Sequence, residues 1–329
     1  KPQTPNPKPQ TPNPKPHSGY WVGLVDSMDW VIWTVGVVAM MVSGVVQGQC
    51  LVEQVVVTLG DNFSLEGGVV DHMYTLSFTA SLQCSQPSHT PTVGITTTDG
   101  TVLMLGQYWT KPISVQIAGV WYNQTGWFYP VSPDQVRSGT NWGIYSNGSL
   151  IEGPINFPVK TGNNDGNIQF AVVADMDLTA YATDTISQIT NMNSGQYDMF
   201  FHVGDFAYNI EDNAGQRGDD FFNRMSQTMR SVPYIITPGN HENFLLGTLF
   251  NYRFRMPTTP NNWITEQQNH YYDFVYKSVY FVTINFDYVL VLHPGKINML
   301  VQWLEGRLIK ASQRPDIEWR VFYSHRPIF

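Results

Sequence analysis

In the C-terminal half of the chain, four short apolar runs are each followed closely by polar residues. These polar residues are Asp175, Asp205 with Tyr208, Asn240 with His241, and His325. Segments with helical periodicity separate the runs, so the pattern predicts an α/β domain in which strands alternate with helices. Open α/β sheets bind ligands at the carboxyl ends of their strands. The sequence therefore predicts one site that brings together Asp175, Asp205, Tyr208, Asn240 and His325, an oxygen-rich and nitrogen-containing set suited to two metal ions.

The expected elements of this domain follow from the same pattern. Strands are expected at Ile168–Ala174, Met199–Val203, Tyr234–Thr237, Val279–Asn285 and Trp319–Tyr323. Helices are expected at Thr183–Met192, Asp219–Met229 and Ile297–Ala311, the last with a core-facing stripe of Leu300, Trp303, Leu304 and Leu308. The polar stretch Gly162–Gly166 predicts a linker in front of the domain.

The preceding segment, from Leu51 to about Lys160, has a different pattern. Short β-branched and aromatic runs alternate with Gly, Pro, Asn and Asp, which predicts a small antiparallel β-sandwich. Its strands are expected at Gln54–Leu59, Met73–Phe78, Val102–Leu105, Ile113–Ile117 and Asn141–Tyr145. Its histidines, His72 and His89, are isolated, so no metal site is expected there.

Composition excludes several classes of protein. The chain has 329 residues, is 42% hydrophobic and carries a formal net charge of −8 without a Lys/Arg-rich patch, so we expect neither disorder throughout nor a nucleic-acid partner. The two cysteines, Cys50 and Cys84, lack the spacing of a zinc or thioredoxin motif. One disulfide between them and two free or intermolecular thiols both stay open.

The N-terminal region predicts passage into the secretory pathway. Residues 1–27 begin with a Pro-rich repeat, which indicates disorder or a leader that is not part of the mature protein. Residues 28–49 contain an uncharged apolar run and predict a cleaved signal peptide or, alternatively, an N-terminal membrane anchor. Asn-x-Ser/Thr sequons at Asn62, Asn123 and Asn147 agree with glycosylation. We therefore expect a secreted, extracellular or vacuolar–lysosomal protein.

The strand-end blocks resemble those of the purple acid phosphatases, within the calcineurin-like metallophosphoesterase superfamily. Here the blocks stand as Ala174-Asp175-Met176-Asp177, Gly204-Asp205-Phe206-Ala207-Tyr208, Gly239-Asn240-His241-Glu242 and Ser324-His325-Arg326-Pro327. The resemblance implies a fibronectin-III-like β-sandwich at residues 51–161 and a layered α/β/β/α metallophosphoesterase domain at residues 167–329. It also implies a metal-dependent acid phosphatase that hydrolyses small phosphomonoesters with a metal-activated hydroxide.

The resemblance assigns the metal ligands of a binuclear centre. It implies that Asp175 and Tyr208 bind Fe(III), and that Asp205 bridges the two metals. It implies further that Asn240 and His325 bind the divalent ion, Fe(II), Zn(II) or Mn(II). These roles suit the residue types, because a phenolate is a hard anionic donor for a trivalent ion while neutral Asn and His leave the second metal Lewis acidic.

The resemblance places His241 beside the phosphate, where it stabilises the transition state or protonates the leaving alcohol. A hydrogen bond that orients the neighbouring Asn240 is the alternative role for this residue. His202 and Arg326 are expected to be structural.

The sequence also departs from the family pattern. Asp177 and Ser324 stand where the family has glycine, and no closing Gly-His-x-His block occurs before Phe329. We therefore expect a catalytic domain that is incomplete at its C-terminus and binds metals weakly. Two alternatives stay open: a phosphodiesterase or nucleotide phosphatase, against which Tyr208 argues, and a non-catalytic secreted or cell-surface binding protein.

Overall fold

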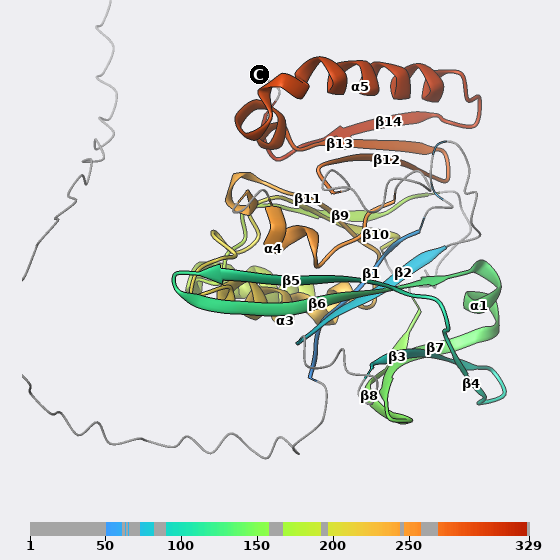
Figure 1. The fold of residues 1–329 in the computed structure, drawn as a ribbon. Coiled ribbons are helices and arrows are strands. Elements are labelled where there is room, and N and C mark those ends of the chain that lie inside the picture. Colours follow the sequence, from blue (N-terminus) through green and yellow to red (C-terminus); the bar gives the residue numbers. More distant parts are fainter. Residues whose placement is uncertain are drawn as a thin grey trace, which may run out of the picture. The chain divides into compact units, whose positions relative to one another are not determined.

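The computed structural model describes residues 51–60, 63, 65, 73–81, 90–157, 167–191, 197–243, 247–257 and 269–327 (Figure 1). The predicted leader, signal peptide or anchor, both cysteines, Asn62, His72, His89 and the predicted linker lie outside these residues. Among the helices of the described part, none combines the length and the apolar character needed to cross a membrane.

The N-terminal part consists of two four-stranded antiparallel sheets. One has the order β1 (Val52–Leu59), β2 (Tyr74–Ser81), β6 (Val120–Val131), β5 (Trp109–Ile117). The other has the order β4 (Val102–Met104), β3 (Thr92–Thr97), β7 (Gly139–Ser146), β8 (Ser149–Asn156). Both sheets bury aromatic side chains in the same core, among them Phe78, Tyr129 and Trp142. The expected strands are present; β3, β6 and β8 are additional, and so is the six-residue helix α1 (Pro133–Ser138).

The C-terminal part contains two three-stranded sheets. The first is parallel, in the order β11 (Tyr234–Thr237), β10 (Met199–Val203), β9 (Phe170–Val173). The second is mixed, in the order β12 (Tyr271–Tyr276), β13 (Val279–Ile284), β14 (Trp319–Tyr323). The connecting helices are α2 (Ala180–Thr190), α3 (Gln216–Met229), α4 (Thr248–Asn251) and α5 (Ile297–Ser312). Two short 3-10 helices, η4 (Asn240–Glu242) and η7 (Pro294–Lys296), and a π-helix, η6 (Tyr288–Leu292), complete them.

Alternation along β10 shows how these layers pack. The Phe201 ring contacts Phe274 and Phe281 of the second sheet, with centroid distances of 6.5 and 5.3 Å. The next side chain, His202, faces the opposite way and lies 5.7 Å from Phe221 of α3. The strand is buried on both faces because one face meets a sheet and the other a helix.

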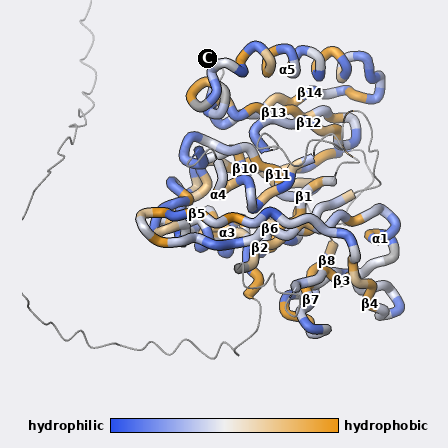
Figure 2. Tube along the Cα trace, viewed as in Figure 1, coloured by the Kyte–Doolittle hydropathy of each residue, from blue (hydrophilic) through white to orange (hydrophobic). Residues whose placement is uncertain are grey.

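Helix α5 covers the far face of the second sheet (Figure 1), and its hydropathy alternates along its length (Figure 2). The predicted stripe holds for Leu300, which is buried, and for Trp303 and Leu304, which are partly buried. It is wrong for Leu308, which is 38% exposed. Arg307 takes the buried place instead, because its guanidinium donates to the Asp273 carboxylate at 2.7 Å.

Strand β9 was expected to be a buried strand, but it is partly exposed. Phe170 and Val172 are exposed. Within the described residues β9 has β10 as its neighbour on one side and forms the edge of the sheet, so only part of its surface is covered.

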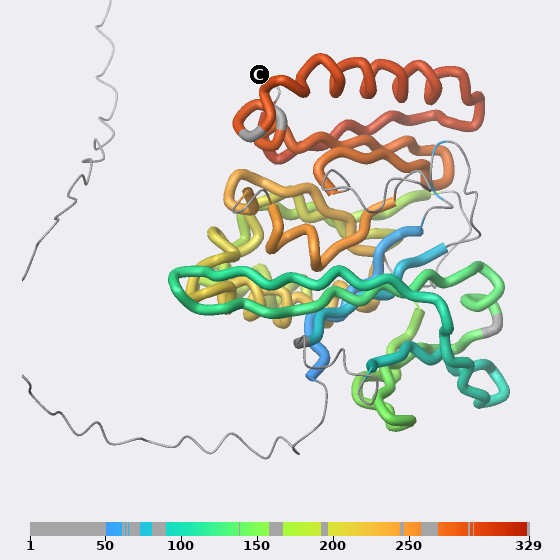
Figure 3. Tube along the Cα trace, in the orientation of Figure 1, coloured from blue at the N-terminus to red at the C-terminus, as the bar shows by residue number. Residues whose placement is uncertain are grey.

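A buried polar network joins the N-terminal sheets to α3. The Asp219 carboxylate accepts hydrogen bonds from Gln54 (2.7 Å), Tyr122 (2.6 Å) and Arg253 (2.7 Å). Arg253 also donates to Gln54 Oε1 at 2.7 Å and is 2% exposed. Figure 3 shows the β5–β6 hairpin running along the segment that leads into α3. The two parts therefore share a continuous interior.

Candidate metal centre

Two loops that follow β9 and β10 run side by side and form the base of the site. The backbone N–H groups of residues 175, 176 and 177 donate to the carbonyl oxygens of residues 204, 205 and 206 at 3.2, 3.1 and 2.8 Å. Asp175 and Asp205 adopt left-handed backbone conformations, with φ of 53° and 50°. Such conformations cost a non-glycine residue of order 1–3 kcal/mol and cluster at functional sites.

The five predicted metal ligands lie together at these strand ends. Donor atoms of Asp175, Asp205 and His325 all lie within 4.8 Å of one another. The Tyr208 hydroxyl donates to Asp175 Oδ1 at 2.6 Å, and His325 Nε2 lies 3.4 Å from Asp205 Oδ2 and 3.3 Å from Asn240 Oδ1. Their role as ligands stays a prediction, but residues from four separate segments do converge on one point.

Two glycines make this convergence possible. A Cβ on Gly204, whose φ is 78°, would lie 2.6 Å from the His325 ring. A Cβ on Gly239 would lie 2.2 Å from Asp205 Oδ1. Neither distance is compatible with a side chain, so the close approach of the ligand segments requires glycine at both positions.

Glu242 holds the backbone of the site in place through buried hydrogen bonds, a role that the sequence analysis did not predict. Its fully buried carboxylate accepts backbone hydrogen bonds from Asp205 (2.8 Å), Phe206 (3.0 Å) and Gly239 (2.8 Å). It thus ties the loop that carries Asp205 to the turn that carries Asn240. The sequence feature that could have indicated this role is the position of Glu242 in the block Gly239-Asn240-His241-Glu242. The block alone does not show which way the side chain points.

Hydrogen bonds and charge set the protonation of the cluster. Burial alone would raise the pKa of Asp205, but hydrogen bonds from His325 and from the His241 backbone amide lower it overall. The hydrogen bond to Asp205 raises the pKa of His325 to about 9, although burial opposes this. A hydrogen bond to Asp175, burial and nearby carboxylates raise the pKa of Tyr208 above the usual range. Protons therefore stay on Tyr208 and His325, close to carboxylate oxygens.

His241 lies at the rim of the cluster, with Nε2 3.7 Å from Asp205 Oδ2 and its ring 4.7 Å from the Tyr208 ring. Its Nδ1 is 2.8 Å from Asn209 Oδ1. Because a carboxamide oxygen only accepts, this contact puts a proton on Nδ1 and leaves Nε2 for the cluster side. Asn209, with φ of 75°, was not singled out from the sequence because nothing local links it to His241.

The neighbouring polar residues have structural contacts. His202 is buried and its Nδ1 lies 2.5 Å from the Tyr234 hydroxyl. Arg326 forms an ion pair with the buried Asp287 at 2.7 Å. Ser324, which replaces the family glycine, donates its hydroxyl to the Ile284 carbonyl at 2.9 Å. These side chains support the strand ends around the site.

The donor set fits metal ions. Carboxylates, a phenol, an amide oxygen and an imidazole suit hard and borderline cations, and the two protons held on Tyr208 and His325 are the ones that metal binding would displace. A cavity of about 420 Å³ opens beside the cluster and is lined by Asp175, Asp177, Tyr181 and Tyr208 among others. A small ligand in this cavity therefore has access to Asp175 and Tyr208.

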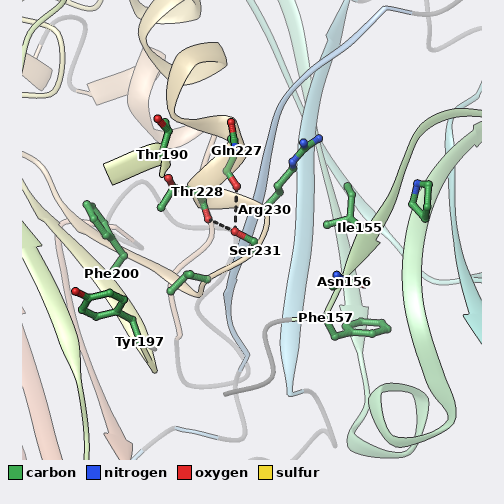
Figure 4. Close-up of a pocket in the computed structure, with 12 residues that line it drawn as sticks. Ile155, Asn156, Phe157, Thr190, Tyr197, Phe200, Gln227, Thr228, Arg230 and Ser231 are labelled. Carbon is green, nitrogen blue, oxygen red and sulfur yellow. Dashed lines mark hydrogen bonds between the residues drawn. The ribbon is translucent and has the colours of Figure 1, made fainter. Parts of the chain in front are cut away.

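A second cavity, of about 280 Å³, lies between β8 and the C-terminal ends of α2 and α3 (Figure 4). The residues that line it in the described part of the chain include no Asp, Glu or His. Its Arg230 is paired with Glu152 at 2.5 Å. Among the described residues, its lining therefore lacks the carboxylates and the imidazole of the first site.

Comparison with known proteins agrees with the fold. Residues 168–329 match the family described as calcineurin-like phosphoesterase. Human acid phosphatase type 7 is 30% identical over 138 residues, which cover 41% of this chain and 30% of that protein. Purple acid phosphatase 22 of Arabidopsis thaliana is 28% identical over 179 residues, which cover 52% of this chain and 38% of that protein. The chain thus spans about a third of the length of these relatives.

The solved structure of a purple acid phosphatase from yellow lupin (Lupinus luteus) seeds superposes with a TM-score of 0.61 at 15% identity, over 84% of this chain and 51% of that one. The family match of residues 168–329 identifies them as a calcineurin-like metallophosphoesterase domain. The chain is a homologue of the purple acid phosphatases and has their fold.

Proposed function

We propose that this protein is a metal-dependent acid phosphatase that hydrolyses small phosphomonoesters at a binuclear centre. One observation carries the proposal: donor groups of Asp175, Asp205, Tyr208, Asn240 and His325 converge at the strand ends, beside an accessible cavity. The homology to acid phosphatases supports the reaction class.

The chain's own residues would divide the work as follows. Asp175 and Tyr208 would hold one metal, Fe(III), Asp205 would bridge, and Asn240 and His325 would hold Fe(II), Zn(II) or Mn(II). When bound, such a pair supplies Lewis acidity that activates water and neutralises phosphate charge. The backbone hydrogen bonds of Glu242 keep Asp205 and the Asn240 turn at a fixed separation while this happens.

His241 is the candidate general acid. Asn209 holds its Nδ1 proton, so Nε2 faces the cluster and, when protonated, is the atom that delivers a proton to the leaving alcohol. Orientation of Asn240 by His241 is the competing role. A large loss of kcat with unchanged metal content in His241→Asn supports the acid role, whereas loss of metal supports the other.

The substrate class is tested by comparing p-nitrophenyl phosphate with bis-p-nitrophenyl phosphate at acidic pH. We expect the monoester to be preferred; a preference for the diester would make the protein a phosphodiesterase, and no hydrolysis by the metal-loaded chain would favour a binding protein. Tyr208→Phe should abolish the visible phenolate-to-iron absorbance and leave the fold intact. Tyr181→Phe is the matched control, because this tyrosine lines the same cavity but is 96% exposed. Absorbance that survives in Tyr208→Phe contradicts the ligand assignment.

We also propose that the protein enters the secretory pathway and ends outside the cell or in a vacuole or lysosome, with N-glycans at Asn62, Asn123 and Asn147. Asn123 and Asn147 are exposed, and Asn147 occupies the turn between β7 and β8 with φ of 50°. Glycosidase treatment of the protein expressed in a eukaryotic host should increase its mobility, and Asn147→Gln should remove part of that shift.

A further inference from the structure

We propose that Arg217 and Asp177 form a clamp that positions the two ligand loops of the metal centre. The inference rests on the proposed function, because it assigns positioning residues to that same site. Neither residue lies among the donors of the cluster. Asp177 is also the place where the sequence departs from the glycine of the family pattern, so the clamp is a feature of this chain.

One guanidinium contacts both loops at once. Arg217 Nε donates to the Ala207 carbonyl at 2.6 Å, directly before Tyr208. Its Nη2 forms an ion pair with Asp177 Oδ1, two residues after Asp175. The same Asp177 oxygen accepts the Leu178 backbone N–H at 2.6 Å. Arg217 stands in the first turn of α3, and it therefore connects the Asp175 loop, the Tyr208 loop and a helix.

The clamp acts at residues whose backbone is left-handed. Asp177 has φ of 67°, Tyr208 of 47° and Asn209 of 75°. Left-handed residues without glycine revert unless their surroundings hold them. At Asp177 the ion pair offsets the energetic cost of a left-handed backbone, which glycine would adopt without strain. At Tyr208 the hydrogen bond to the preceding carbonyl fixes the peptide that aims the phenol at Asp175.

The burial of the pair adds to its strength. The Arg217 and Asp177 side chains are 26% and 17% exposed, whereas the Arg137–Asp134 pair in α1 is 73% and 81% exposed. Solvent screens the exposed pair far more than the partly buried one. Arg137→Gln is therefore a matched control, since it removes a guanidinium from an ion pair far from the ligand loops in sequence.

The first test needs no metal. Hydrogen exchange followed by mass spectrometry should show faster exchange at 175–179 and at 204–209 in Arg217→Gln. Asp177→Asn keeps a side chain that tolerates left-handed backbone and should loosen mainly 175–179. Arg137→Gln should change neither segment. Unchanged exchange at 204–209 in Arg217→Gln overturns the clamp, whether or not the protein is a phosphatase.

The second test uses ferric iron as the probe and reads the tyrosinate absorbance of the full chain. Partners that orient ligands typically contribute about 10- to 100-fold to metal affinity. We expect Arg217→Gln to weaken iron binding by that factor and to shift the absorbance maximum, with partial rescue in Arg217→Lys. Wild-type affinity and an unmoved maximum in Arg217→Gln overturn the positioning role. If the wild-type chain binds no iron, the proposed function fails, and the exchange test still decides the clamp.

Discussion

The buried network around Arg253 gives the sharpest stability prediction. Arg253→Met removes the guanidinium that donates to Asp219, Gln54 and Tyr122. The Asp219 carboxylate then stays buried with Gln54 and Tyr122 as its remaining side-chain donors. Removing one partner of a buried ion pair typically costs about 3–5 kcal/mol, because the other charge is left uncompensated. We expect the free energy of unfolding to fall by that amount.

The assay is urea unfolding at pH 7, followed by tryptophan fluorescence, with Arg137→Met as the control. The exposed Arg137–Asp134 pair contributes about 0–1 kcal/mol by comparison. Replacing both partners, Asp219→Leu with Arg253→Met, should destabilise by less than Arg253→Met alone, since no buried charge remains. The reasoning is refuted if Arg253→Met costs no more than Arg137→Met, or if the double variant shows the sum of its single effects.

Two further predictions concern the site and the interior. Gly239→Ala should abolish metal binding, because its Cβ would lie 2.2 Å from Asp205 Oδ1. The control is Gly306→Ala in α5, whose Cβ meets nothing within 4 Å and should leave metal binding unchanged. Equal metal content in the two variants would contradict the prediction. Burial lowers the pKa of His270 to about 3, so its neutral form stabilises the fold above the unfolded pKa of about 6.5, and that contribution is lost as pH falls from about 6.5 towards 3. The free energy of unfolding should fall over this range by up to about 1.4 kcal/mol per pH unit more in the wild type than in His270→Gln; equal slopes would contradict the prediction.

Local pattern predicted several strands of the C-terminal part well because each apolar run is short and ends on a polar residue. β10, β11 and β14 have the predicted bounds. Strands such as β6 and β12 were not predicted. Gly126 and Pro130 lie inside β6, and such residues are typical of turns. Leu308 was placed in the core because periodicity cannot show that Arg307 finds a buried carboxylate in Asp273.

The convergence of the site residues followed from the rule that strand ends meet, but their supports did not. Glu242, Asn209 and Arg217 act through backbone groups and side chains that are distant in sequence. Asp175 and Asp205 are left-handed as well, and their backbone N–H groups donate to the Gly204 carbonyl and to Glu242. A sequence pattern can indicate which residue types meet at a site. The contacts that hold these residues in place form only in the folded chain.

Helix α3 links the N-terminal sheets to the candidate metal centre. Arg217 and Asp219 lie two residues apart, about 200° around the helix, so one faces the ligand loops and the other faces the buried network. Loss of Arg253 should therefore loosen the ligand loops as well as the interior. We expect Arg253→Met to speed exchange at 204–209, and to add less in an Arg217→Gln background than in the wild type. Effects that add within about 0.5 kcal/mol would show that the network and the clamp are independent, and that the N-terminal sheets stabilise the fold without positioning the site.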